Sequence, residues 1–165
     1  MNYPPAKADV FYELARDRFD RQLNAVDAMD AKLATFLAIG SGLVALLAAI
    51  YAIRPGNFLW AGAVVLALAT VVYAALAIAA LSAMRPREWN DGPSMEDVYK
   101  DHITYTEGEI MWRAAHSLVA FHKTNADAYA PKARIASWCP FLLLLELALV
   151  VAGAVLAAVS TGPAI

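Results

Sequence analysis

The sequence predicts an all-α integral membrane protein: a helical bundle of three transmembrane helices, extended by amphipathic cytoplasmic helices. The first observation behind this class is composition, because 61% of the 165 residues are hydrophobic and 17% are charged, far from the balance of soluble domains. The second is three apolar runs, at 33–53, 58–84 and 135–159, which together hold a single formal charge. Each run exceeds the ~20 residues that a helix needs to cross a bilayer core, and none has the polar stripe of a buried soluble helix.

The segment 6–30 predicts an amphipathic helix that leads into the first span. Its apolar residues recur every three to four positions, with charged residues between them: Phe11, Leu14, Phe19, Leu23, Val26 and Met29. No proline or glycine separates this segment from Leu33. We therefore expect one helix from about residue 6 to residue 53, preceded by a stop at Tyr3-Pro4-Pro5.

Positive charge predicts the orientation of the spans. The short hairpin between the first two spans holds one cation, Arg54, and no cation follows the third span. The other twelve of the thirteen Lys and Arg residues lie on the opposite side of the predicted membrane. By the positive-inside rule, the N-terminus and the segment 85–134 are cytoplasmic and the C-terminus is outside. Trp60 and Trp138, near the ends of two spans, fit interfacial anchoring.

The segment 85–134 predicts a loop followed by cytoplasmic helix. Two prolines and an Asn-Asp-Gly sequence mark the loop at 85–93, and Ser94 with Asp97 resembles a capping box. A helix or helix pair should follow, with a break near Gly108 and a kink or restart at Pro131 before the third span. The apolar faces of the two cytoplasmic regions should pack together, and the proposed regulatory contacts are Phe19 and Leu23 with Leu118 and Phe121.

Composition and motifs argue against several classes of function. A net charge of −2 does not favour nucleic-acid binding, and the lone Cys139 excludes a disulfide framework within the chain and a paired-cysteine zinc site. His102, His116 and His122 lack the spacing of a metal-binding helix. No nucleophile triad order, phosphate loop or zinc-protease motif appears. We therefore expect no enzyme activity, no metal and no cofactor.

Glu146 is the one ionisable residue deep in a span. A carboxylate at that depth costs at least ~2.5 kcal/mol on insertion scales, so it must be protonated, paired, or in contact with protein or water. Two interpretations stay open: a pore-lining or gating carboxylate, or a neutral acid that bonds across helices to Thr70, Tyr73 or Ser41. Small residues in the first and third spans also make close helix packing and a homo-oligomer feasible.

Three short stretches carry a resemblance to a known family. They are Asp30-Ala31-Lys32-Leu33 entering the first span, Pro86-Arg87 after the second, and Asn125 to Lys132-Ala133-Arg134 leading to the third. With the order of helices, they resemble the Pycsar transmembrane effector domain family, which is related to the SLATT proteins of bacterial anti-phage defence. The similarity covers nearly the whole chain, which we interpret as a single membrane domain, 1–165.

The resemblance implies an effector of cyclic-nucleotide signalling in the bacterial inner (plasma) membrane. Such an effector responds to a nucleotide made during infection, cUMP or cCMP, and then assembles or opens, impairs the membrane and causes abortive infection. This sequence has no β-rich segment for a nucleotide-binding domain. Nucleotide binding would therefore fall to the cytoplasmic helices or to a partner sensor protein. Two competing hypotheses are a non-catalytic membrane adaptor that docks a partner, and a small channel or transporter subunit whose path oligomers would build.

Overall fold

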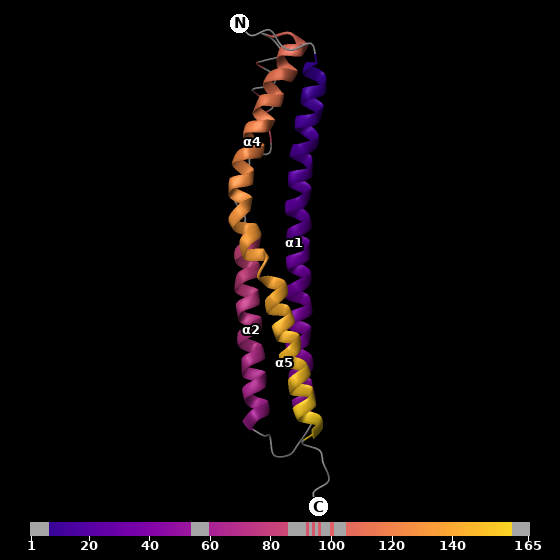
Figure 1. Cartoon of the computed structure of the whole chain (residues 1–165), viewed down its shortest axis with the longest axis vertical. Helices are drawn as coiled ribbons and strands as arrows, with labels where there is room; N and C mark the ends of the chain where they lie inside the picture. Colours follow the sequence, from indigo (N-terminus) through magenta and orange to yellow (C-terminus); the bar gives the residue numbers. More distant parts are fainter. Residues whose placement is uncertain are drawn as a thin grey trace, which may run out of the picture. The chain divides into compact units, whose positions relative to one another are not determined.

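The computed structural model describes residues 7–53, 60–85, 92, 94, 96, 100 and 105–159. Four long helices run through them (Figure 1): α1 (Ala8–Ala52), α2 (Trp60–Met84), α4 (Glu107–Ala136) and α5 (Cys139–Val159). No strand occurs in these described ranges. The all-α fold class is confirmed. Within the same residues, three helical stretches are long and apolar enough to cross a membrane, as a multi-pass membrane protein requires.

Contacts divide the chain into two compact units. The first unit combines Met1–Ala28 with Pro86–Pro131, and the second combines Met29–Arg85 with Lys132–Ile165. Helices α1 and α4 each contribute residues to both units. The second unit contains the three apolar helical stretches, and the first contains the amphipathic ones.

Helix α1 is unbroken from Ala8 to Ala52, as the absence of proline and glycine before Leu33 predicts. From Phe19 onward, its buried positions recur every seven residues, at Phe19, Val26, Leu33, Gly40 and Leu47. A strict seven-residue repeat keeps one seam of a helix turned toward its neighbours through a left-handed supercoil. In each unit, the other helices therefore pack against this repeating side of α1.

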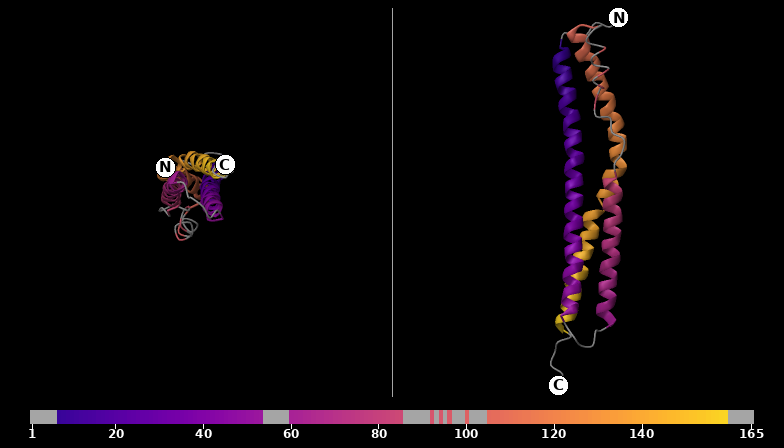
Figure 2. Two further views of the ribbon diagram at one scale, coloured as in Figure 1. Left: turned by 90° about the horizontal axis from the view of Figure 1, so that it is seen from below. Right: turned by 180° about the vertical axis from the view of Figure 1, so that it is seen from behind.

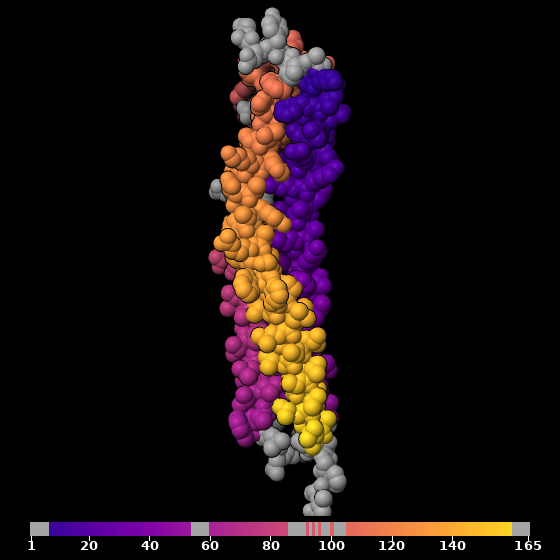
Figure 3. Space-filling model, in the orientation of Figure 1, coloured from indigo at the N-terminus to yellow at the C-terminus, as the bar shows by residue number. Residues whose placement is uncertain are grey.

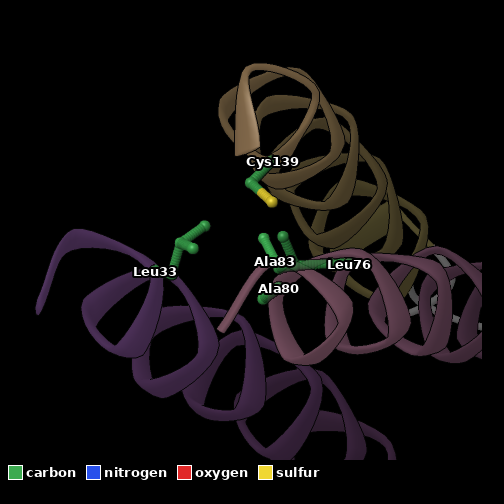
Figure 4. Close-up of a cluster of buried hydrophobic side chains, with 5 residues drawn as sticks. All are labelled: Leu33, Leu76, Ala80, Ala83 and Cys139. Carbon is green, nitrogen blue, oxygen red and sulfur yellow. The ribbon is translucent and has the colours of Figure 1, made fainter. Parts of the chain in front are cut away.

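The second unit packs α1, α2 and α5 around an apolar interior, and the three helices form a triangle when seen end-on (Figure 2). Helix α5 lies against both of the others in the space-filling view (Figure 3). One cluster of buried residues draws on all three helices (Figure 4): Leu33, Leu76, Ala80, Ala83 and Cys139. A second does so further along: Leu47, Ala69 and Val150. We call these the Leu33 cluster and the Leu47 cluster.

The first unit packs the start of α1 against α4. Its core is Ala15, Phe19, Ala115 and Leu118, with Phe11, Tyr12, Leu23 and Phe121 partly buried against it. Rings extend this packing, because the centroid of Trp112 lies 5.0 Å from Phe11 and 4.5 Å from His116. We call this set the Phe19 cluster.

A break in the helix lies just before Gly108, as the sequence predicts. Ser94 is not helical, Glu96 and Lys100 are helical and paired at 2.7 Å, Tyr105 and Thr106 are not helical, and α4 starts at Glu107. Thr106 caps α4, since its amide and hydroxyl donate to Glu109 Oε2 at 2.9 and 2.8 Å. These bonds hold the pKa of Glu109 below its ordinary value.

The interruption before the third span is displaced from its expected position. Helix α4 continues through Pro131 to Ala136, so a restart at Pro131 is wrong, while a kink there stays a prediction. The helix ends at Ala136, and a turn at Ser137 and Trp138 leads directly into α5, whose second residue is Pro140. Proline is tolerated in a first helical turn and disfavours helical conformation in the residue before it. Pro140 therefore explains why a new helix starts here.

Candidate functional site

The buried polar side chains of α4 and α5 occupy positions of one seven-residue repeat in the sequence. We call these positions, Asn125, Lys132, Cys139 and Glu146, the polar line. Three polar or charged residues are buried in the described part of the chain, Asn125, Lys132 and Glu146, with 1%, 3% and 0% of their surface exposed. They lie seven and fourteen residues apart, and buried Cys139 occupies the position between the last two. These are core positions of a seven-residue repeat, which apolar residues ordinarily occupy. The second unit therefore has ionisable groups in its interior.

Glu146 is enclosed between helices of the second unit. Its carboxyl lies against Gly40 of α1, where an added Cβ would come within 2.9 Å of Oε2. The same Cβ would lie 3.0 Å from carbon atoms of both Leu76 and Tyr73 of α2. Neither carboxyl oxygen has a hydrogen-bond partner among the described residues. Because Gly40 has no side chain, the Glu146 carboxyl can occupy the space beside it. Carbon atoms of Leu76 and Tyr73 border the same space.

The hydroxyl partners suggested for Glu146 are not its partners in the structure. Ser41 is exposed and donates to the carbonyl of Ala38 at 2.9 Å. Thr70 is also exposed and donates to the carbonyl of Leu66 at 2.9 Å. Both hydroxyls bond the preceding turn of their own helix, as Ser and Thr commonly do. The predicted bonds from Ser41 and Thr70 are therefore wrong, and so is the one from Tyr73, since both carboxyl oxygens of Glu146 lack a hydrogen-bond partner among the described residues.

An ion pair joins α1 to α4 in the second unit. Lys132 Nζ lies 2.8 Å from Asp30 Oδ1 and 2.9 Å from Oδ2. The lysine side chain is 4% exposed and the aspartate 33%, so a largely buried ammonium depends on one carboxylate. These two residues come from separate stretches of the family resemblance, and the structure brings them together.

The other residues of that resemblance lie elsewhere. Lys32 is exposed on α1. Asn125 is buried in the first unit. Pro86 and Arg87 lie outside the described residues, as do Arg54, Asp97 and His102. Among the resemblance residues that the structure describes, Asp30 and Lys132 form an ion pair.

Two glycines make room for Tyr51, which is not among the predicted site residues. Tyr51 of α1 donates its hydroxyl to the carbonyl of Gly153 on α5 at 3.1 Å. A Cβ at Gly62 of α2 would lie 2.9 Å from the Tyr51 ring, and one at Gly153 would lie 3.2 Å from its hydroxyl. This bond satisfies a polar group inside an apolar segment. Glycines in spans that are otherwise rich in alanine and leucine are the signal for it.

The first unit contains the proposed regulatory contacts. Phe19 and Leu118 are buried together in the Phe19 cluster, and Leu23 and Phe121 pack against it. The predicted packing of these four residues is therefore confirmed. In the same unit, Gln22 donates to the carbonyl of His122 at 3.1 Å, while Gln22 Oε1 and His122 Nδ1 are buried without a hydrogen-bond partner.

The polar line could have been found in the sequence. Leu118, Asn125, Lys132, Cys139, Glu146 and Gly153 follow one another at intervals of seven. A search for apolar periodicity passes over them, because most of them are polar or small. In the described part of the chain, no group of three or more His, Cys, Asp or Glu side chains is placed to hold a metal ion.

Comparison of the chain with protein-family models, with curated proteins and with solved structures finds no match.

Proposed function

We propose that this protein is a small effector of the bacterial inner membrane that is held closed until a signal triggers it, and that then impairs the membrane. The observation that carries the proposal is Glu146, whose carboxyl is fully buried in the second unit without a partner. A helix that serves only as an anchor gains nothing from a buried carboxyl, because burying such a group without a hydrogen bond costs several kcal/mol. A second arrangement that brings this carboxyl to water would recover that free energy.

The same observation favours a closed state over a permanent pore. Pore-lining carboxylates contact water, whereas Glu146 is 0% exposed and its carboxyl lies against Gly40 of the neighbouring helix. The described arrangement is therefore the resting one. Opening or reassembly of the three helices is the step that exposes Glu146, and a homo-oligomer would supply the additional helices.

We assign the first unit to the cytoplasm and to the restraint of this opening. Twelve of the thirteen Lys and Arg residues support an inside N-terminus and an outside C-terminus. The Phe19 cluster closes α1 on α4, and both helices continue into the second unit. A trigger that favours a different packing of this cluster would act on the membrane helices through α1 and α4.

The resemblance in sequence supports a nucleotide signal in anti-phage defence. A cyclic nucleotide, cUMP or cCMP, would bind the first unit or a partner sensor protein, and the triggered effector would stop phage spread by abortive infection. The trigger must favour the open arrangement by its differential affinity, by ~5.5 kcal/mol for a switch from 1:99 to 99:1.

A membrane adaptor is the second candidate. Apolar side chains of the first unit are exposed at Val10, Leu14 and Val119, which leave 54%, 51% and 46% of their surface free. A cytoplasmic partner could dock there while the second unit anchors the complex. In that case the membrane would stay intact whatever the packing of the Phe19 cluster.

Loosening the Phe19 cluster separates the two candidates. Removal of a core leucine side chain costs about 2 to 5 kcal/mol, so Leu118→Ala or Leu23→Ala should shift the protein toward the open state without a signal. Expressed in bacteria, either variant should depolarise the inner membrane and slow growth more than wild type, as read by a membrane-potential dye at matched membrane abundance. Leu14→Ala is the control, because that leucine is 51% exposed on the same unit.

The adaptor gains support if both core variants insert and stay silent, and if a co-expressed nucleotide cyclase also leaves the wild type silent. The effector proposal would then be withdrawn.

A further inference from the structure

We propose that Glu146 is a proton-binding site in the membrane segment, and that the proton is the ion that the open protein conducts. This inference rests on the proposed function and names its permeant ion. It starts from a carboxyl group that is 0% exposed, has no partner, and lies beside a glycine in the neighbouring helix.

The surroundings of Glu146 favour a proton over other cations as the bound ion. Calcium and magnesium ions are held by about six or more oxygen ligands. Glu146 is the one buried acid in the described part of the chain, and carbon atoms of Leu76 and Tyr73 border the space beside Gly40 that its carboxyl enters. A proton needs no such cage, because it forms a single covalent O–H bond with one carboxyl oxygen. Binding also removes the charge that the apolar surroundings disfavour.

Apolar clusters close the interior on both sides of Glu146. Along α5, the Leu33 cluster includes Cys139, seven residues before Glu146, and the Leu47 cluster includes Val150, four residues after it. Along α1, Gly40 lies midway between Leu33 and Leu47. In the closed state both clusters exclude water from the carboxyl group. A proton path therefore requires that both clusters open or admit water.

The polar line indicates where a path would start. Lys132, paired with Asp30, precedes Glu146 by fourteen residues of the same seven-residue repeat, which is roughly 21 Å along a helix. When water enters along this line, the O–H bond of the protonated Glu146 carboxyl breaks and its proton passes to water on one side. A new O–H bond forms when hydronium on the other side transfers a proton to the carboxylate oxygen. The net step moves one proton, with no oxidation or reduction.

Infrared spectroscopy of the full-length protein in vesicles tests the binding site without requiring the protein to open. The carbonyl stretch of a protonated carboxyl should appear at neutral pH in the wild type and disappear in Glu146→Gln. Glu13→Gln is the matched control, because Glu13 is exposed on α1 and its removal should leave the band unchanged. If the wild type shows no such band, or if Glu146→Gln retains it, the proposed site is overturned.

Conduction is tested with the full chain in vesicles of phosphatidylethanolamine and phosphatidylglycerol. Vesicles containing Leu118→Ala enclose a pH-sensitive dye, and a potassium gradient with valinomycin imposes a potential; parallel vesicles enclose carboxyfluorescein to detect a wide leak. Leu118→Ala should acidify the interior without releasing carboxyfluorescein. Adding Glu146→Gln should reduce acidification to the level of protein-free vesicles, while Glu146→Asp, which keeps a shorter carboxyl, should retain part of it. Adding Glu13→Gln should have no effect.

The outcomes distinguish this inference from the proposed function. If Leu118→Ala vesicles release carboxyfluorescein, and adding Glu146→Gln does not reduce that release, proton selectivity is overturned and the effector function still stands. Acidification that Glu146→Gln does not change would also overturn the site. Leu118→Ala vesicles that neither acidify nor release carboxyfluorescein would overturn proton conduction, whereas the proposed function is withdrawn only by the silent cell experiments described above.

Discussion

Position 40 of α1 shows how a single hydrogen atom in place of a methyl group shapes the interior of the second unit. Glycine there lets the Glu146 carboxyl lie close to the α1 backbone, and Leu76 and Tyr73 close the same space. Gly42, two residues later in the same span, has nothing within 4 Å of where a Cβ would stand. The two glycines therefore have different roles, although both are small residues in one apolar run.

At this scale we predict opposite effects for the two alanine substitutions. Gly40→Ala should lower the free energy of unfolding by about 1 to 3 kcal/mol, because the new methyl group overpacks three neighbours. Gly42→Ala should be neutral, or stabilising by up to about 1 kcal/mol, because alanine loses less backbone entropy in a helix. Thermal unfolding of both proteins in one detergent measures the difference. Equal stability of the two variants would show that Glu146 does not lie against Gly40.

Between elements, the Asp30–Lys132 pair fixes α1 to α4 in the second unit. The chain also offers an exposed pair for comparison, Arg21 with Asp17 at 2.9 Å, whose side chains are 78% and 51% exposed. Ion pairs in water contribute little, since solvent screens the charges and the side chains lose freedom. The Lys132 ammonium is different, because its burial makes it dependent on its single described partner.

We therefore expect Asp30→Asn to destabilise the protein by roughly 3 kcal/mol, the lower end of the range for breaking a buried pair, since Asp30 is one-third exposed. Asp17→Asn should cost no more than about 1 kcal/mol. Adding Lys132→Met to Asp30→Asn should recover part of the loss, because no uncompensated charge then remains. A double-mutant cycle by thermal unfolding checks all three values. If Asp30→Asn and Asp17→Asn are equally mild, the buried pair does not hold the two helices together.

For the whole molecule, the distribution of charge predicts how the chain crosses the membrane. Three spans place the two ends on opposite sides, and the first unit, which holds most of the Lys and Arg residues, should stay in the cytoplasm. The proposed regulation depends on this placement, because a cytoplasmic signal would have to reach the Phe19 cluster.

Reporter fusions test this orientation. Alkaline phosphatase, which is active only outside the cytoplasm, should be active after Ile165 and inactive at the N-terminus. A fluorescent protein that matures only in the cytoplasm should show the reverse pattern, and serves as the control for expression. An active phosphatase at the N-terminus would place the first unit outside and contradict the proposed regulation.

The sequence by itself determined the helical class, the three spans and the unbroken α1. It could do so because lipid demands apolar residues over a known length and leaves no alternative to helix for such runs. It also determined that Phe19 and Leu23 share one apolar face and that Leu118 and Phe121 share another, since apolar residues at helical spacing lie on one side of a helix. These properties depend on the spacing of residues within one stretch of sequence, so the apolar pattern predicts them directly.

Only the tertiary structure decided which groups meet inside the bundle. Periodicity assigns Ser41 and Gly40 to neighbouring positions on one helix, but the rotation of α1 places Gly40 against Glu146 and leaves Ser41 exposed. The pairing of Asp30 with Lys132, 102 residues apart, depends in the same way on how two helices are set against each other. A helical repeat shows which residues share a face, but not which helix packs against that face. The free energy of a buried charge depends on the groups that this packing brings next to it.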